Sequence, residues 1–220
     1  MRLPILFFCT LGSASAAVIS VTDSTATAIP DGSSAGVVRS LTVSAPGQNI
    51  VSAEVDVDLS SFSVFDIFLG DLYFYLQHDA DLAILVNRPG RRAGAPAGYG
   101  DNQSMNVTFT MLATNDFHNY RLNVTGSHAI PLSGPLTGSW QPDGRAVDPA
   151  VVLDSSLRTA GLDVFNGDTA SGTWNLFAAD LSTGSLHQIN SWTLRLDVIP
   201  EPGSSVLLLA AAALTIRRRR

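Results

Sequence analysis

The amino-acid sequence predicts an all-β fold in which two antiparallel sheets pack face to face as a sandwich. Hydrophobic residues recur at every second position along the middle of the chain, and no long amphipathic helix is predicted between residues 18 and 199. The apolar runs are short, and turns rich in glycine, asparagine and aspartate separate them. About eight such strands in one domain without a disulfide are typical of a jelly roll.

The strands follow from the alternation of side chains along the chain. After a first strand at residues 37–43, a longer one at residues 50–59 is predicted to face inward with Val51, Ala53, Val55, Val57 and Leu59. Further strands are predicted at residues 72–76, 82–86, 107–111 and 173–178, with an exposed loop, rich in Gly, Pro, Ala and Arg, at residues 88–102. The last strand is predicted to face inward with Trp192, Leu194, Leu196 and Val198.

Residues 17–199 are expected to form one domain, because about 180 residues bury about 70% of their unfolded surface. Of the 19 carboxylates, 18 fall in this part of the chain together with eight arginines and no lysine, which gives a net charge of about −10. An acidic domain disfavours nucleic acid as a partner and is compatible with divalent cations and with neutral or basic extracellular material.

An N-terminal secretory signal is predicted at residues 1–16. Its three parts are a basic start at Met1 and Arg2, an apolar core at residues 3–11 and a cleavage site with small residues at Ala14 and Ala16. Such a segment directs a chain to the Sec translocon and to signal peptidase. Cys9 is the only cysteine and lies within this signal, so the processed protein is expected to contain no disulfide.

The C-terminus predicts a second targeting segment at residues 200–220. It consists of Pro200-Glu201-Pro202, an apolar run at residues 206–216 and four terminal arginines. As a helix the run reaches about 16 Å, against about 30 Å for the hydrocarbon core of a bilayer, so it is expected to form a short transmembrane helix. Arginines favour the cytoplasmic side, which puts the preceding domain on the other side of the membrane.

This order of motif, apolar run and basic end resembles the PEP-CTERM sorting signal of Gram-negative bacteria. The resemblance implies transient anchoring in the inner membrane and processing by an exosortase-like enzyme. It also implies delivery of the domain to the cell surface or to the extracellular matrix, with extracellular polysaccharide as an expected partner.

A second resemblance covers residues 29–198, nearly the whole predicted domain. It rests on the order of Ile29-Pro30-Asp31, residues 50–59, Gly70-Asp71-Leu72-Tyr73-Phe74-Tyr75-Leu76, Phe165-Asn166-Gly167, Gly172-Thr173-Trp174-Asn175-Leu176, Asp180 and Ile189-Asn190-Ser191-Trp192-Thr193-Leu194. In this order the chain resembles the P domain, also called the P/Homo B domain, of proprotein convertases and bacterial subtilisin-like proteases. The resemblance implies an eight-stranded jelly roll that stabilises a peptidase and helps to set its response to pH and calcium. Residues 60–69 and 77–81 depart from the family pattern.

The candidate site residues are mostly interpreted as structural. Trp174 and Trp192 are predicted to anchor the core, with their indole N–H groups hydrogen-bonded inside. Aspartates that follow turns bond the turn amides, and this is the first interpretation of Asp71 and Asp180. The alternative is that Asp71, Asp101 and Asp180 turn their oxygens toward a Ca²⁺ ion, the one cofactor considered.

No catalytic centre is predicted. The P-domain resemblance leaves no room for the separate domain that carries a Ser-His-Asp triad, and the four histidines lack metal-binding spacing. Asp56 with Asp58, or Asp79 with Asp81, is the alternative of a glycosidase pair, although carboxylates at such positions are usually solvated strand edges.

The sequence therefore predicts a non-catalytic, exported surface module. One alternative is an accessory domain that acts in trans with a subtilisin-like serine endopeptidase. A second alternative is a carbohydrate-binding jelly roll, which would expose aromatic side chains on one face. The aromatic candidates for such a face are Tyr73, Tyr75, Tyr99 and Tyr120.

Overall fold

The computed structural model describes residues 16–61, 68–184 and 186–201. Of the predicted targeting segments, Ala16, Pro200 and Glu201 fall within this part. Ala14, Pro202 and the apolar run at residues 206–216 lie outside the described residues. Within the described ranges, no helix is both long enough and apolar enough to cross a membrane.

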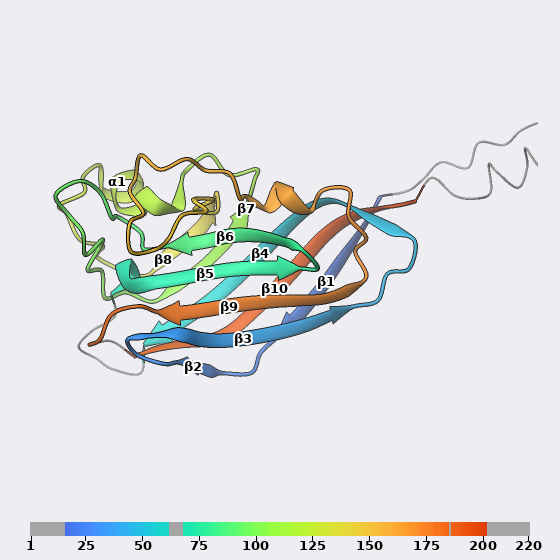
Figure 1. Cartoon of the computed structure of the whole chain (residues 1–220), viewed down its shortest axis with the longest axis horizontal. Helices are drawn as coiled ribbons and strands as arrows, with labels where there is room; N and C mark the ends of the chain where they lie inside the picture. The colour runs from blue at the N-terminus through green and yellow to red at the C-terminus, as the bar shows by residue number, and fades with distance from the viewer. Residues whose placement is uncertain (1–15, 62–67, 185, 202–220) are drawn as a thin grey trace, which may run out of the picture.

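The described residues form two sheets that pack as a sandwich, with the four-stranded sheet in front in Figure 1. The six-stranded sheet contains β1 (Ala17–Asp23), β2 (Thr27–Ile29), β4 (Gln48–Ser61), β7 (Met105–Thr110), β8 (Leu136–Trp140) and β10 (His187–Pro200). The four-stranded sheet contains β3 (Ser33–Val43), β5 (Leu72–His78), β6 (Asp81–Asn87) and β9 (Gly172–Asp180). The predicted all-β sandwich is confirmed.

The strand order is that of a jelly roll. The larger sheet runs β1-β10-β4-β7-β8, with β2 also paired to β10, and the smaller sheet runs β3-β9-β5-β6. With β2 and β8 set aside, the first strand pairs with the last and the second with the last but one, so that the two halves of the chain interleave. All pairs are antiparallel except β7 with β8, which is parallel.

Among the described residues, helical structure is limited to short segments between strands. These are η1 (Leu69–Asp71), η2 (Phe117–Asn119), α1 (Tyr120–Thr125) and η3 (Leu162–Phe165). Gly126 ends α1 because it adopts a left-handed conformation, with φ of 76°, and donates its N–H to the Leu122 carbonyl.

The core lies between the sheets and follows the predicted alternation, with one exception in β4. Val51 was predicted to face inward, yet it is 46% exposed while Ile50 is 3% exposed. Val198 of β10 pairs with Ile50 and Asp197 pairs with Ser52, so Val51 is the extra residue of a β-bulge. The bulge turns the side chains before it to the opposite face, which the alternation alone cannot indicate.

Trp174 and Trp192 are both fully buried in this core. The Trp174 indole N–H donates to the Ala170 carbonyl at 3.3 Å, and its ring stacks on His78 at 4.0 Å. The indole nitrogen of Trp192 has no hydrogen-bond partner among the described residues, contrary to the prediction of paired indoles. Its position is therefore determined by packing alone.

Residues 88–104 and 111–161 form a thick layer that consists mostly of loops, and we call this layer the loop lobe. It includes α1 and β8, and most of it lies at the end of the sandwich opposite to the start of β1 and the end of β10 (Figure 1). Part of the lobe runs along β6, since Asp143 donates its N–H to the Leu85 carbonyl and Ile84 donates its N–H to the Ala160 carbonyl.

The prediction that residues 88–102 form an exposed loop is wrong for much of the segment. Tyr99 is 1% exposed, and Arg91 and Asp101 are also buried. A Cβ at Gly70 would lie 2.5 Å from the Tyr99 backbone nitrogen, and one at Gly90 would lie 2.4 Å from the Tyr99 ring. The glycines of this region permit close packing around Tyr99 and are not a sign of exposure.

Candidate functional site

Two of the three predicted calcium ligands, Asp71 and Asp180, come together at the junction of β5 and β9. Asp180 pairs with Leu72, and Leu181 donates its N–H to the Asp71 carbonyl at 2.9 Å. Burial raises the pKa of Asp71 and the Asp180 charge adds to this, while Ser182 and Arg88 act in the other direction. The Arg88 guanidinium donates to Asp71 at 3.0 Å, so the cluster contains its own cation.

Asp180 also forms a buried pair with a histidine. The His187 Nδ1 lies 2.8 Å from Asp180 Oδ2, and both side chains are fully buried. This is the arrangement of a base and its orienting acid in a catalytic triad. The His187 ring is, however, enclosed by the sandwich, and its Nε2 meets no partner among the described residues.

The third aspartate, Asp101, is held in the loop lobe by protein donors. It accepts hydrogen bonds from the Tyr120 hydroxyl at 2.7 Å, the Arg121 Nε at 2.9 Å and the Leu132 N–H at 2.7 Å. In the part of the chain that the structure describes, no group of three His, Cys, Asp or Glu side chains is arranged to hold a metal ion. The structure therefore does not gather the three aspartates into one ligand set.

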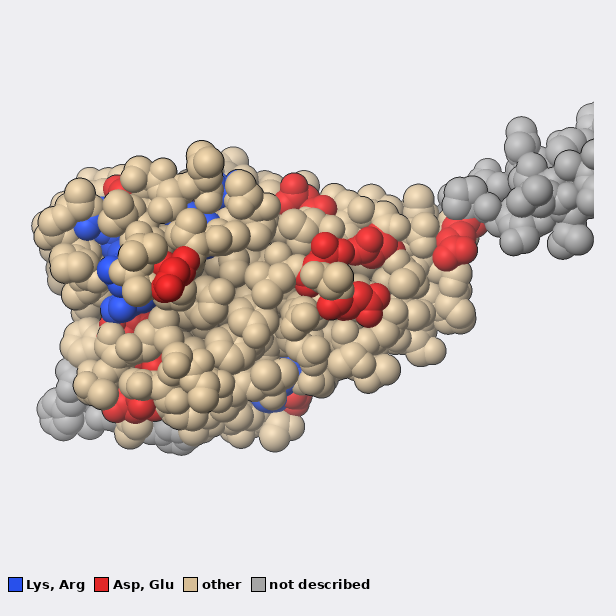
Figure 2. Space-filling view, viewed as in Figure 1, with Lys and Arg blue, Asp and Glu red and all other residues tan. Residues whose placement is uncertain are grey.

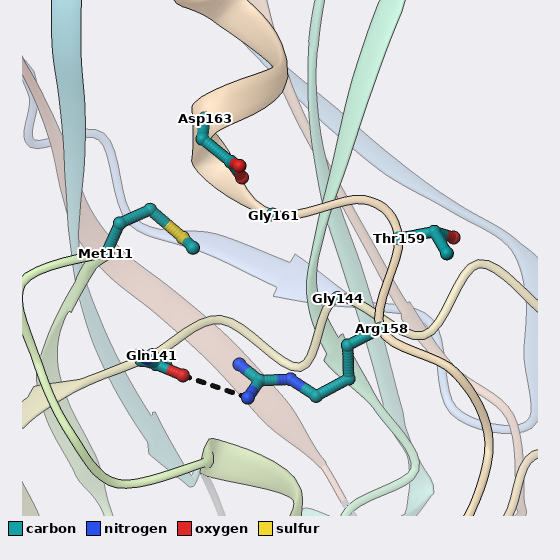
Figure 3. Close-up of a pocket in the computed structure, with 7 residues that line it drawn as sticks. All are labelled: Met111, Gln141, Gly144, Arg158, Thr159, Gly161 and Asp163. Atoms are coloured by element: carbon teal, nitrogen blue, oxygen red, sulfur yellow. Dashed lines mark hydrogen bonds between the residues drawn. The ribbon is translucent and has the colours of Figure 1, made fainter.

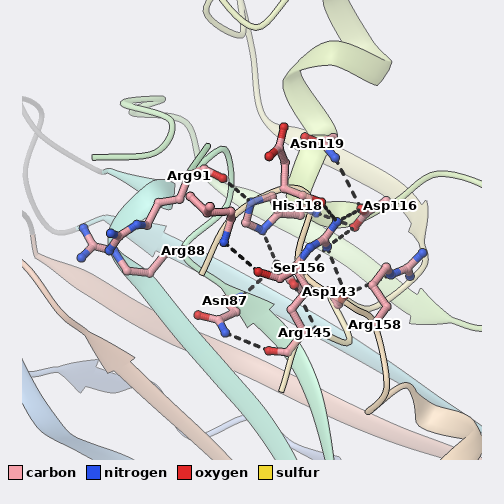
Figure 4. Close-up of polar contacts among 12 residues, drawn as sticks. Asn87, Arg88, Arg91, Asp116, His118, Asn119, Asp143, Arg145, Ser156 and Arg158 are labelled. Carbon is pink, nitrogen blue, oxygen red and sulfur yellow. Dashed lines mark hydrogen bonds and ion pairs between the residues drawn. The ribbon is translucent and has the colours of Figure 1, made fainter. Parts of the chain in front are cut away.

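A second polar cluster lies mostly inside the loop lobe and reaches Asn87 at the end of β6 (Figure 4). His118 Nδ1 lies 2.7 Å from Asp143 Oδ2, and its Nε2 lies 2.9 Å from the Arg91 carbonyl. Arg145 bridges Asp143, at 3.2 Å, and Asp116, at 2.7 Å. His118, Asp143 and Arg145 are all buried, and Asp116 is 19% exposed at the edge of this network, which joins three separate loops.

Arginines hold the lobe together through its backbone carbonyls. Six of the eight arginines of the predicted domain lie there, and Figure 2 shows their blue atoms mainly at this end of the molecule. Each donates to at least one carbonyl; Arg91, for example, reaches Pro149 at 2.8 Å and Ala150 at 2.7 Å. The others are Arg88, Arg92, Arg121, Arg145 and Arg158, which bond the carbonyls of Gly70, Gly90, His128, Asp154 and Pro142.

An open pocket of about 210 Å³ lies on the surface of the lobe (Figure 3). It is lined by Met111, Gln141, Gly144, Arg158, Thr159, Gly161 and Asp163. Arg158 donates to Gln141 Oε1 at 2.9 Å as well as to two backbone carbonyls, so its guanidinium is largely used by the protein.

A different kind of surface lies on the outer side of the four-stranded sheet. Tyr73 and Tyr75 of β5 and Phe177 of β9 point away from the core and are half-buried against one another. The Tyr75 and Phe177 rings stack with centroids 4.7 Å apart and planes at 12°, and the Tyr73 ring lies 5.9 Å from Tyr75. We call these three residues the aromatic face.

The four predicted glycan-binding tyrosines thus separate into two pairs. Tyr73 and Tyr75 lie on the outer face, whereas Tyr99 and Tyr120 are buried in the lobe. Burial raises the pKa of Tyr99 to about 12, and its hydroxyl lies 2.5 Å from His128 Nδ1. Phe177 was not among the predicted residues, although its position opposite Tyr75 follows once the pairing of β5 with β9 is known.

The carboxylate pairs considered for a glycosidase are occupied differently. Asp56 accepts hydrogen bonds from Thr108 at 2.6 Å and from Arg195 at 2.7 Å on the outer face of the larger sheet. Asp81 lies beside Asp168, and burial together with the Asp81 charge raises the pKa of Asp168. Only the second region thus places two carboxylates against each other at the surface.

No protein-family model matches this sequence, and no curated protein matches it either. Among solved structures, it is similar to a chain in the crystal structure of the Aeromonas sobria serine protease (ASP) and chaperone (ORF2) complex. The sequences are 14% identical, and the match covers 84% of this chain and 27% of that chain with a TM-score of 0.46. This chain therefore spans about a quarter of the length of the solved chain it matches.

Proposed function

We propose that this chain is a non-catalytic, exported binding module displayed outside the cytoplasm. The observation that carries the proposal is how the histidines are used. His78, His118 and His187 are fully buried with hydrogen bonds inside the fold, and His128 bonds the buried Tyr99. General acid–base chemistry needs such a group within reach of a substrate, and here these groups serve the structure.

The ends of the domain support display from a membrane. Ala17 pairs with Val198, so β1 begins where β10 ends, and both targeting segments join the sandwich at one end. Glu201 donates its N–H to the Gly47 carbonyl at 2.8 Å at that same end. With the C-terminal tail held by the inner membrane, the loop lobe projects outward. Processing by an exosortase-like enzyme then delivers the domain to the surface or extracellular matrix of a Gram-negative bacterium.

Cell fractionation tests this proposal. The full chain is expected in the envelope, with its N-terminus beginning near Ala17. Deletion of residues 202–220, which leaves β10 complete, is expected to release the domain in soluble form. The full chain in the cytoplasm with residues 1–16 still attached would overturn the proposal, as would hydrolysis of a peptide or glycan substrate by the purified protein.

A second candidate is an accessory domain that works in trans with a subtilisin-like serine endopeptidase. What favours it is that segments of the P-domain resemblance lie on strands of a jelly roll. Residues 70–76 span η1 and β5, residues 172–176 lie in β9, and residues 189–194 lie in β10. If this role is correct, adding the chain to such a peptidase lengthens the half-life of the peptidase at elevated temperature. An unchanged half-life would argue against it.

A further inference from the structure

We propose that the aromatic face binds a neutral polysaccharide of β-linked pyranose units. The inference rests on the proposed export, since only a displayed domain meets such a polymer. Pyranose rings with equatorial hydroxyls present C–H groups on both faces, and these stack on aromatic rings. The four-stranded sheet carries such rings on its outer side, and in Figure 1 no other described element lies in front of this sheet.

The register of the strands puts the rings in one row. Val38 of β3 pairs with Phe177, and Phe177 pairs with Tyr75, so three apolar side chains lie side by side across the sheet. Tyr73 extends the row along β5, two residues away on the same face. A contiguous patch of exposed apolar side chains often marks an interaction site, whereas a single exposed apolar residue is ordinary.

The chain brings its backbone unusually close to this row. A Cβ at Gly36 would lie 2.7 Å from the Phe177 ring and 2.4 Å from the Ala178 carbonyl. The backbone of Gly36 has φ of 55°, which also favours glycine. Gly36 therefore allows the Phe177 ring to pack directly against the backbone of β3 while it stacks on Tyr75.

A polar row runs beside the aromatic row and supplies hydrogen bonds. It consists of Ser40, Asn175 and Gln77, which pair across β3, β9 and β5. The Ser40 hydroxyl donates to Asn175 Oδ1 at 2.7 Å, which holds the side-chain amide in place on this face. Planar amides beside aromatic rings suit the hydroxyls of a sugar, because both the C–H faces and the O–H groups then find partners.

The distribution of charge on the domain favours a neutral polymer as the ligand. In Figure 2 the middle of this face is largely free of charged side chains, whereas acidic groups gather toward one end. The Asp148 charge acts on Tyr73 from the side of the lobe. With a net charge of about −10 on the predicted domain, an anionic polysaccharide is repelled.

Affinity electrophoresis tests the proposal with the full chain in a zwitterionic detergent that carries no sugar. Native gels contain hydroxyethylcellulose, a soluble β-linked glucan, or one of two controls: dextran, whose α-linked units form no flat ribbon, and anionic alginate. We expect retardation by hydroxyethylcellulose alone. No retardation, or equal retardation by dextran or alginate, would overturn the proposal.

Variants separate binding from folding. Tyr75→Leu keeps apolar contact with Phe177 but removes the ring, and we expect about tenfold weaker binding with little change in melting temperature. Asn175→Ala is expected to weaken binding without touching the aromatic packing, whereas Leu157→Ala, an exposed lobe residue, serves as the matched control. Full binding by both Tyr75→Leu and Asn175→Ala would rule the face out. If the domain is exported but does not bind the glucan, the glucan proposal fails and the proposed function stands. If the domain binds the glucan but stays in the cytoplasm, the proposed function fails and the glucan proposal stands.

Discussion

In the sandwich, Trp174 and Trp192 pack among aliphatic and aromatic side chains from both sheets, whereas the interior of the loop lobe is occupied by Arg145, Asp143 and His118. Both regions contain buried apolar side chains, such as Phe117 and Tyr120 in the lobe, but the lobe adds a buried network of charged side chains. The reason lies in the backbone. Strands satisfy their N–H and C=O groups in ladders, so the side chains between the sheets are free to be apolar.

The loops have few ladders, and their carbonyls need other donors. Arginine provides five N–H donors in a rigid planar group, and it keeps its charge when buried. The lobe uses this property repeatedly: Arg145 bonds the Asp154 carbonyl and two carboxylates, and Arg158 bonds the carbonyls of Pro142 and Asp143. The predicted domain contains no lysine, and most of its arginines hydrogen-bond irregular backbone and hold it in place.

The largest effect is expected in the sandwich. Trp174→Ala should lower the free energy of unfolding by about 3–5 kcal/mol, because it leaves a cavity and removes the contacts of the indole with Phe165 and with the stacked His78 ring. Trp192→Ala should act similarly, and either change should unfold or strongly destabilise the whole domain in a thermal melt, since domains are stable by only about 5–15 kcal/mol. A melting temperature equal to that of the parent would mean that the packing of the two sheets does not hold the fold together.

A smaller and more local effect is expected in the lobe. Arg145→Met retains the volume but leaves Asp116 and Asp143 without their cation, at a cost of about 3 kcal/mol. Hydrogen exchange should show faster exchange in residues 111–161 than in β9 and β10, because the sandwich keeps its own core. Uniform faster exchange in both regions would show instead that lobe and sandwich unfold as one cooperative unit. Leu157→Ala on the lobe surface is the control and should leave exchange unchanged.

The same contrast explains what the sequence could predict. The period of two identified the buried faces of β4 and β10, but it did not indicate the register shifts at Val51 of β4 and between Ile189 and Ser191 of β10. It did not identify β1, whose side chains are mostly exposed, or β8, which has hydrophobic residues only at its two ends. The lobe has no period at all: His118 meets Asp143 25 residues away, and Arg91 meets Pro149 58 residues away. Such contacts depend on how the chain folds, and the local pattern of hydrophobic and polar residues does not indicate them.

Two of the three residues of the aromatic face could be predicted from the sequence. Tyr73 and Tyr75 stand at alternate positions of a predicted strand, and the structure places both on its outer face. Phe177 joins them only through the pairing of β5 with β9, which links positions about 100 residues apart. Tyr99 is buried although its glycine-rich segment was predicted to be exposed, and Tyr120, a candidate without such a pattern, is buried with its hydroxyl bonded to Asp101.

Tyr99 provides a third test, since its segment was predicted to be an exposed loop. Tyr99→Ala is now expected to cost about 3 kcal/mol, because the ring fills the space beside Gly90 and contacts Tyr120 and the Arg121 guanidinium. Ala93→Ser, at the exposed tip of the same segment, should cost almost nothing. If chemical denaturation gave the same stability for both variants, the lobe would contribute nothing to the fold beyond its ion pairs.

The smallest effect concerns a carboxylate that lacks the arginine partner typical of the lobe. Burial, with the neighbouring Asp81 charge and hydrogen bond, raises the pKa of Asp168 above its ordinary value of 3.8. A raised pKa in the folded state means that the fold prefers the protonated form, so ionised Asp168 weakens the domain at neutral pH. That loss is recovered as the pH falls through the raised pKa toward 3.8.

Asp168→Asn should therefore stabilise the domain at pH 7 by no more than a few tenths of a kcal/mol, since the side chain is partly exposed and solvent screens it. Thermal melts at pH 7 and near pH 3 check this, with Asp163→Asn, another acidic residue on the surface, as the control. The gain should vanish at the lower pH, and a gain that is equal at both values would show that repulsion between Asp81 and Asp168 is not its cause.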